Sequence, residues 1–176
     1  MSSLRCQSTD HTIVFNTTAK LKHSTLLPPT ATFEAAVAVL HNHDAILRLD
    51  PEFVSYEAKP TPASSKNPAT KYYSVTDHMN ALPAGLWDTT VKFEAEITDI
   101  PKGVEWIIHA PLGIYQVTFW TIEPDPESEG RLYFVEDVSI TCSRLLVGTV
   151  RGKCTENQPG VHKKFVDLVL AKLSAA

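Results

Sequence analysis

The sequence has little cysteine and no segment that could cross a membrane. Its three cysteines, Cys6, Cys142 and Cys154, are odd in number and lack CxxC spacing, which argues against a disulfide framework and a zinc site. The longest apolar run, residues 35–40, is far too short to span a bilayer, and residues 1–10 lack the apolar core of a signal peptide. We therefore expect a cytoplasmic protein without a transmembrane segment.

Basic patches and the common cofactor motifs are also missing. The chain has 16 Lys and Arg against 20 Asp and Glu, a net charge of -4 and no basic block, so nucleic acid is not an expected partner. No GxSxG, P-loop or GxGxxG motif occurs, which removes the commonest hydrolase, phosphate-binding and dinucleotide-binding explanations. We expect no cofactor.

Histidine spacing gives no support for a bound metal. His41 and His43 are two residues apart on an expected helix, whereas ligands on one helical face are three or four apart. We therefore expect no metal site.

What is present is the composition of an ordinary globular protein, with 176 residues of which 43% are hydrophobic. No internal repeat is visible, so we expect one domain over residues 1–176, with residues 1–10 flexible. A chain of this length can bury a core and still enclose a pocket. The oligomeric state stays open.

Periodicity predicts the elements at the two ends of the chain. Residues 11–21 alternate as in a strand, and apolar residues recur at helical spacing from about residue 33 to residue 47. Phe165, Val169 and Leu173 define the apolar face of a C-terminal helix over residues 161–173. Residues 144–154 fit either an extension of the last strand or a short helix.

Between these ends, residues 52–141 have a period of two that five turn signals interrupt. The turns read KPTPASSKNP, NALPAG, DIPKG, APLG and PDPESEG. In APLG, Pro111 and Gly113 stand at the second and fourth positions of an expected type I turn. Because connections this short join antiparallel neighbours, the pattern predicts a six-stranded meander. With the flanking strand and helices it makes a two-layer α+β domain.

This order of elements resembles the helix-grip fold of the START and birch-pollen-allergen (SRPBCC) superfamily. The segments LHNHDAILRLDP, YYSVTDHM, APLGIYQVTFW and VEDVSITCSRLL are similar to a fungal branch of that superfamily. The resemblance covers almost the whole chain. It implies a curved antiparallel seven-stranded sheet wrapped on a long C-terminal helix, with a hydrophobic cavity between them. Relatives include carriers, polyketide aromatase/cyclases and chaperone-associated modules, so the fold alone does not select a function.

Strand phase predicts which side chains face the cavity, since alternate residues of a strand point to opposite faces. We expect Phe165 and Val169 to form a lid over the sheet. The expected ligand contacts are Tyr73, Val75, Phe93, Trp106, Ile108, Phe119, Phe134, Val138, Phe165 and Val169.

Two carboxylates, Asp77 and Glu136, fall in otherwise apolar strand phases. Apolar surroundings disfavour a charged carboxylate and raise its pKa toward the range that suits general acid or base work. Alternatively, each carboxylate lies near a strand end or a bulge, or binds backbone amides or an arginine. A slip of one residue would also exchange Glu136 with Asp137. If Tyr115 shares the inward phase of Val117 and Phe119, its hydroxyl is a third candidate.

The leading hypothesis is a cytosolic pocket protein that acts on an apolar, polyketide- or terpenoid-like small molecule. It would be a cofactor-independent cyclase, dehydratase or isomerase of secondary metabolism, with Asp77, Glu136 and Tyr115 as catalytic residues. Two alternatives stay open: a non-catalytic carrier of a lipid or hydrophobic metabolite, and a protein-interaction module.

Overall fold

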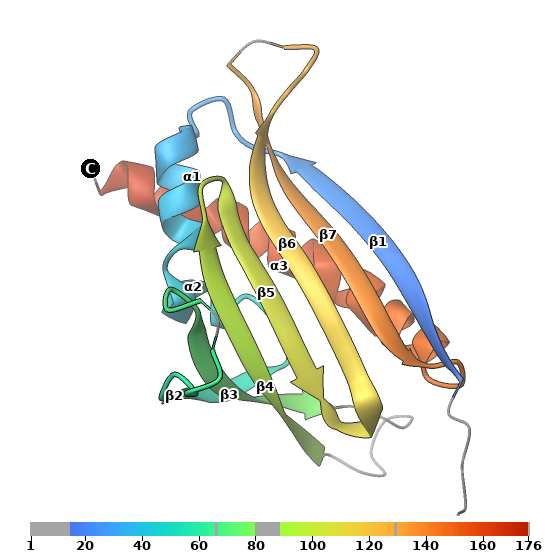
Figure 1. The fold of residues 1–176 in the computed structure, drawn as a ribbon. Coiled ribbons are helices and arrows are strands. Elements are labelled where there is room, and N and C mark those ends of the chain that lie inside the picture. Colours follow the sequence, from blue (N-terminus) through green and yellow to red (C-terminus); the bar gives the residue numbers. More distant parts are fainter. Residues whose placement is uncertain (1–14, 66, 80–88, 129, 176) are drawn as a thin grey trace, which may run out of the picture.

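The computed structural model describes residues 15–65, 67–79, 89–128 and 130–175 (Figure 1). Within these ranges the strands are β1 (Asn16–Leu26), β2 (Phe53–Lys59), β3 (Lys71–Met79), β4 (Thr89–Ile100), β5 (Gly103–Ala110), β6 (Ile114–Pro124) and β7 (Leu132–Ser143). The helices are α1 (Phe33–Leu40), α2 (His43–Leu47) and α3 (Val147–Ser174), and the 3-10 turn η1 (Pro111–Gly113) joins β5 to β6. The expected NALPAG turn lies outside the described residues.

The strands form one antiparallel sheet in the order β1-β7-β6-β5-β4-β3-β2. The prediction of a meander over residues 52–141 is confirmed, since each strand from β2 to β6 pairs with the next one in sequence. The first strand closes the order by pairing with the last, and Leu21 lies opposite Val138. The sheet is therefore the seven-stranded sheet that the sequence predicts.

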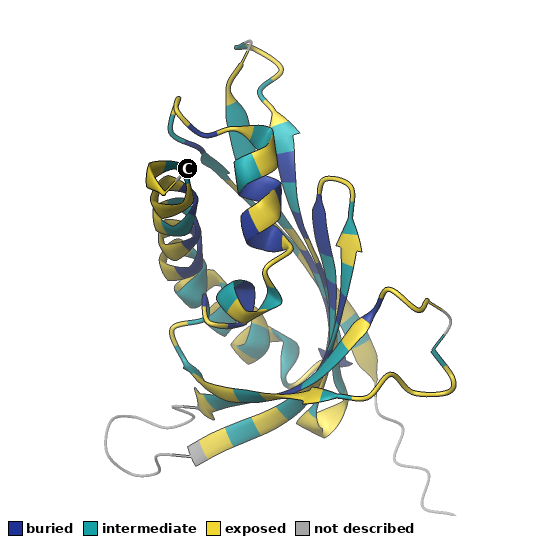
Figure 2. Cartoon of the chain, turned by 90° about the vertical axis from the view of Figure 1, so that its left-hand side faces the viewer, coloured by how far each residue is buried: buried dark blue, intermediate teal, exposed yellow. Residues whose placement is uncertain are grey.

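All three helices lie on one side of this sheet, and α3 runs along it against α1, β1 and β7 (Figure 2). The main core lies between the helices and the sheet, and its fully buried large side chains include Leu40, Ile46, Ile97, Ile122, Phe134 and Phe165. The long C-terminal helix on a curved sheet confirms the helix-grip architecture. No helix in the described ranges is both long enough and apolar enough to cross a membrane.

The helix expected over residues 33–47 is two short helices. Thr32 caps α1 and Asn42 caps α2, each through a side-chain oxygen that accepts a backbone N–H. Between them, His41 Nε2 donates to the backbone carbonyls of Ile100 and Gly103 at 3.1 and 3.0 Å. These hydrogen bonds attach the segment between α1 and α2 to the β4–β5 turn.

The C-terminal helix begins at Val147, fourteen residues before its expected start. Residues 144–154 therefore belong mostly to α3, and the expected start at residue 161 is wrong, since the helix runs through Pro159. Pro159 is exposed, so water can reach the carbonyl that its missing N–H leaves unpaired. The added turns are held by tertiary packing, because Val147, Val150 and Cys154 cover Ile140 and other residues of β7.

Two connections between strands have unusual backbone geometry. A Cβ on Gly103 would lie 1.9 Å from the carbonyl oxygen of Trp120, so only glycine fits the β4–β5 turn against β6. In the β5–β6 connection, Leu112 adopts φ 62° and ψ 22° and Gly113 adopts φ 71°. The expected type I turn is therefore wrong, since its third residue requires a negative φ.

Candidate functional site

Asp77 and Glu136 both point to the inner face of the sheet, as the strand phase predicts. Asp77 follows Val75 in the inward phase of β3, and Glu136 stands between buried Phe134 and Val138 on β7. The possible exchange of Glu136 with Asp137 does not occur, because Asp137 is exposed on the outer face.

The expected inward positions of Tyr115 and Phe119 are wrong. Both side chains are 39% exposed and belong to the outer phase of β6. The inward phase of this strand contains Gln116, Thr118, Trp120 and Ile122. The prediction treated the apolar residues of β6 as inward, whereas β6 turns two polar side chains to the interior.

The remaining expected ligand contacts divide by depth. Six are buried core residues, at most 7% exposed: Val75, Trp106, Phe134, Val138, Phe165 and Val169. The rings of Phe134 and Phe165 stack directly with centroids 4.1 Å apart, so the expected lid is packed core. Tyr73, Phe93 and Ile108 are inward and partly accessible.

Tyr73 is tied to α2 rather than free. Its hydroxyl lies 2.8 Å from Nδ1 of His43, whose Nε2 donates to Asp99 Oδ1 at 2.9 Å. Burial raises the pKa of Tyr73, with smaller contributions from Tyr56 and Asp99. The chain of hydrogen bonds holds α2 against β3 and β4.

The accessible part of the inner face contains both apolar and polar side chains. We define the inner site by Asp77, Phe93, Ile108, Gln116 and Cys154. None of the five is exposed, and each keeps partial contact with solvent. The Cys154 thiol of α3 donates to Gln116 Oε1 at 3.7 Å, and Gln116 donates to Thr118 at 3.0 Å.

Asp77 is the least satisfied group of the inner site. It lies opposite Phe53 of β2 and Val91 of β4, and its Oδ1 is buried without a hydrogen-bond partner among the described residues. Burial, followed by the negative charges of Asp50 and Glu52, raises its pKa to about 7. Both the protonated and the charged form of Asp77 are therefore populated near neutral pH.

The two neighbouring carboxylates, in contrast, have partners. Asp50 Oδ1 accepts from the backbone N–H of Glu52 at 2.8 Å and from Asn157 of α3 at 3.3 Å. Glu52 accepts from Lys153 at 2.9 Å. Burial raises the pKa of Asp50, and the bond to Glu52 raises the pKa of Lys153. These bonds join α3 to the start of β2 beside Asp77.

Glu136 has one hydrogen-bonded oxygen and one oxygen close to a histidine. Its Oε1 accepts from Trp120 Nε1 at 2.9 Å, and its Oε2 lies 3.4 Å from His162 Nε2, without hydrogen-bond geometry. The other ring nitrogen of His162 lies 2.7 Å from the Thr25 hydroxyl. His162 was missed from sequence, although it stands three and seven residues before Phe165 and Val169 on the same helical face.

Cys154 is suited to neither metal binding nor nucleophilic attack. Burial, with the charges of Glu136 and Asp50, raises the pKa of this thiol to about 11, so it stays protonated. The described residues contain no cluster of three His, Cys, Asp or Glu side chains that could hold a metal ion.

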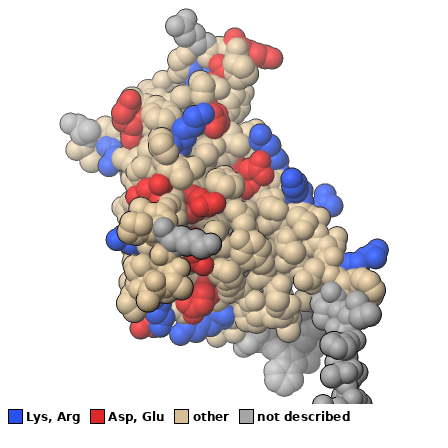
Figure 3. Space-filling model, in the orientation of Figure 1, with Lys and Arg blue, Asp and Glu red and all other residues tan. Residues whose placement is uncertain are grey.

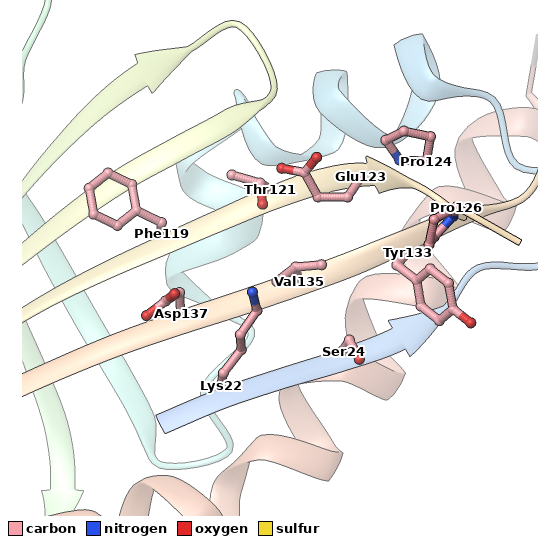
Figure 4. Close-up of a pocket in the computed structure, with 10 residues that line it drawn as sticks. All are labelled: Lys22, Ser24, Phe119, Thr121, Glu123, Pro124, Pro126, Tyr133, Val135 and Asp137. Atoms are coloured by element: carbon pink, nitrogen blue, oxygen red, sulfur yellow. The ribbon is translucent and has the colours of Figure 1, made fainter. Parts of the chain in front are cut away.

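The outer face carries a hollow with a volume of about 440 Å³ (Figure 4). Its walls come from the outward phases of β1, β6 and β7 and from the β6–β7 connection, and include Lys22, Phe119, Tyr133 and Asp137. It contains neither Asp77 nor Glu136, so we place the candidate chemistry at the inner site.

Comparisons with known proteins agree with this architecture. The model of a family described as a domain of unknown function (DUF7053) matches residues 16–171. No curated protein matches the chain. Among solved structures, norcoclaurine synthase from Thalictrum flavum has a TM-score of 0.59 at 11% identity, covering 97% of this chain and 96% of that one.

Two further solved structures have the same fold. Ara h 8.0201 has a TM-score of 0.57 at 16% identity and covers 88% of this chain and 99% of its own. The Zhui aromatase/cyclase from Streptomyces sp. R1128 has a TM-score of 0.57 at 11% identity and covers 90% and 94%. At these identities the likeness establishes the fold alone, which is the helix-grip fold.

Proposed function

Because the chain belongs to the DUF7053 family and has the helix-grip fold, we propose that it binds an apolar small molecule at its inner site and acts on it. The substrate class would be polyketide- or terpenoid-like. The reaction would be a cyclisation, dehydration or isomerisation that needs no cofactor. The aromatase/cyclase and synthase names of two structural neighbours support such a role for the fold.

The observation that carries the proposal is the raised pKa of Asp77 together with the lack of a partner for its Oδ1 among the described residues. A carboxyl group with a pKa of about 7 can donate a proton to a carbonyl or accept one from the adjacent carbon at physiological pH. Its Oδ1 has no partner within the described chain. Phe93 and Ile108 would hold an apolar ligand against the sheet, so that shape and one acid–base group together assist the reaction.

Glu136 would have a different task. Its hydrogen bond to Trp120 and its approach to His162 tie β6, β7 and α3 together. We assign it to positioning the inner face rather than to proton transfer. Tyr115, on the outer face, takes no part in this proposal.

A binding experiment tests the inner site. Ile108 and Ile107 are neighbours on β5, are both partly buried, and face opposite sides of the sheet. Ile108→Trp should reduce the binding of the fluorescent apolar probe 1-anilinonaphthalene-8-sulfonate, because the larger ring fills the accessible inner face. Ile107→Trp is the matched control and should bind like the parent. Equal binding by both variants and the parent would place the ligand elsewhere.

A second experiment tests catalysis. The chain should accelerate the exchange of the α-protons of 1-tetralone with D2O, followed by NMR, and Asp77→Asn should lower that rate on the order of 10²-fold. Probe binding should persist in this variant, since the amide keeps the side-chain volume. Binding without any acceleration by the parent would instead support the carrier, and exchange that survives Asp77→Asn would refute the role of Asp77.

A further inference from the structure

The three most exposed large apolar side chains of the described chain gather at one end of the sheet. Phe15, Leu112 and Leu145 are 66%, 77% and 91% exposed. The backbone N–H of Arg144 donates to the carbonyl of Phe15 at 3.1 Å, which places Phe15 beside Leu145. The η1 turn carrying Leu112 contacts β7, and Tyr115, which follows this turn, lies opposite Thr141 near the end of β7. We call these three side chains the apolar tip.

The backbone conformation of Leu112 is strained. Its φ of 62° lies in the left-handed region, which residues other than glycine rarely adopt. The side chain belongs to neither of the two apolar clusters of the described residues. A strained leucine that contacts no core suggests a contact outside the chain.

The chain segments that carry the apolar tip contain basic residues and no acidic ones. Residues 15–20, 110–115 and 139–151 contain Lys20, Arg144 and Arg151 but no Asp or Glu, although the whole chain carries -4. All three basic side chains are exposed. Figure 3 shows Lys and Arg side chains along the edge of the molecule where β1 lies. Apolar side chains that protrude between basic ones match the surface of an anionic bilayer.

We propose that the apolar tip docks on membranes that contain anionic lipid. The three apolar side chains insert at the boundary between headgroups and acyl chains, and Arg144 and Arg151 contact the headgroups. We choose a bilayer as the occupant because exposed apolar side chains beside exposed basic ones can insert while the basic groups meet anionic headgroups. This activity goes beyond the proposed function and does not depend on Asp77.

Co-sedimentation of the full chain with vesicles tests the proposal. The parent should bind phosphatidylcholine vesicles containing about a third phosphatidylserine more tightly than pure phosphatidylcholine vesicles. The double variant Leu112→Ser/Leu145→Ser should lose about tenfold or more of this binding. The matched control is Val54→Ser/Leu170→Ser, which removes two exposed apolar side chains elsewhere and should bind like the parent.

Two further variants separate docking from folding. Arg144→Gln and Arg151→Gln should each weaken binding to the anionic vesicles about fivefold. Leu112→Gly should raise the melting temperature, because glycine tolerates the positive φ, while it weakens vesicle binding. The proposal is overturned if the parent does not bind anionic vesicles, if it binds both vesicle types equally, or if the Leu112/Leu145 variant binds as well as the parent.

Discussion

Asp77 and Glu136 occupy comparable inward positions on two strands, but their neighbours differ. Glu136 accepts a hydrogen bond from Trp120 and faces His162, whereas Asp77 Oδ1 has no partner within the described residues. The negative charges of Asp50 and Glu52 add to the effect of burial in raising its pKa. The contrast separates a structural acid from a candidate catalytic one.

The raised pKa of Asp77 predicts a pH-dependent stability. The folded state binds the Asp77 proton more tightly than the unfolded state, since its pKa rises from 3.8 to about 7. The contribution of Asp77 to the free energy of unfolding is therefore complete below pH 3.8 and is lost as the pH rises to about 7. Asp77→Asn removes this loss, so urea denaturation should show the variant gaining stability relative to the parent across that interval. A difference that is constant with pH would contradict the assigned pKa.

A second prediction concerns Glu136. Glu136→Leu leaves the Trp120 N–H buried without its acceptor, which should lower the free energy of unfolding by about 1–3 kcal/mol. The control Asp137→Leu changes the neighbouring exposed carboxylate on the outer face and should stay within about 0.5 kcal/mol of the parent. Denaturant titrations of both variants check this, and equal stabilities would show that the Trp120 bond contributes nothing.

Residue placement could be predicted from sequence wherever apolar alternation was clear. The phase of β7 placed Glu136 correctly because Phe134, Val138 and Ile140 surround it in the same phase. On β6 the same logic placed Tyr115 and Phe119 wrongly, since Gln116 and Thr118 are inward. The partners of Asp77 and Glu136, including His162, depend on contacts between distant elements that no single strand pattern encodes.

At the scale of elements, the sheet was more predictable than the helices. Proline- and glycine-rich turns such as DIPKG and PDPESEG marked the strand ends, and the meander follows from their short lengths. Helix boundaries failed where local signals compete with packing. The first helix ends at Leu40 with His41 as its C-cap, and Asn42 caps α2 two residues later. Pro159 does not end α3, because packing on β7 holds the preceding turns.

Two glycines should respond in opposite ways to the same change. Gly103→Ala would place a Cβ 1.9 Å from the Trp120 carbonyl oxygen, so the β4–β5 turn must shift and the free energy of unfolding should fall by more than about 2 kcal/mol. Gly152 lies on the exposed side of α3, where an added Cβ would meet no atom within 4 Å. Gly152→Ala should therefore raise the free energy of unfolding by about 0.5–1 kcal/mol. Chemical denaturation checks both, and a neutral Gly103→Ala would mean that the turn adapts freely.

Across the whole molecule, α3 joins two apolar clusters of unequal size. Its first turns cover Val138, Ile140 and Cys142, while Val161, Phe165 and Val169 belong to the main core with α1 and α2. Glu136 and His162 lie where the helix passes from one cluster to the other. The polar contacts at this point fix the register between α3 and the sheet, on which the inner site depends.

The pairing of β1 with β7 also sets when the sheet can be completed on the ribosome. Asn16 pairs with Ser143, 127 residues later, whereas every other strand pairs with its neighbour in sequence. At translation rates of roughly 5–20 residues per second, the first strand waits about 6 to 25 s for its partner. During that interval its backbone hydrogen-bonding groups are available to other chains, so the nascent protein has a period of vulnerability to misassembly that ends only when β7 emerges.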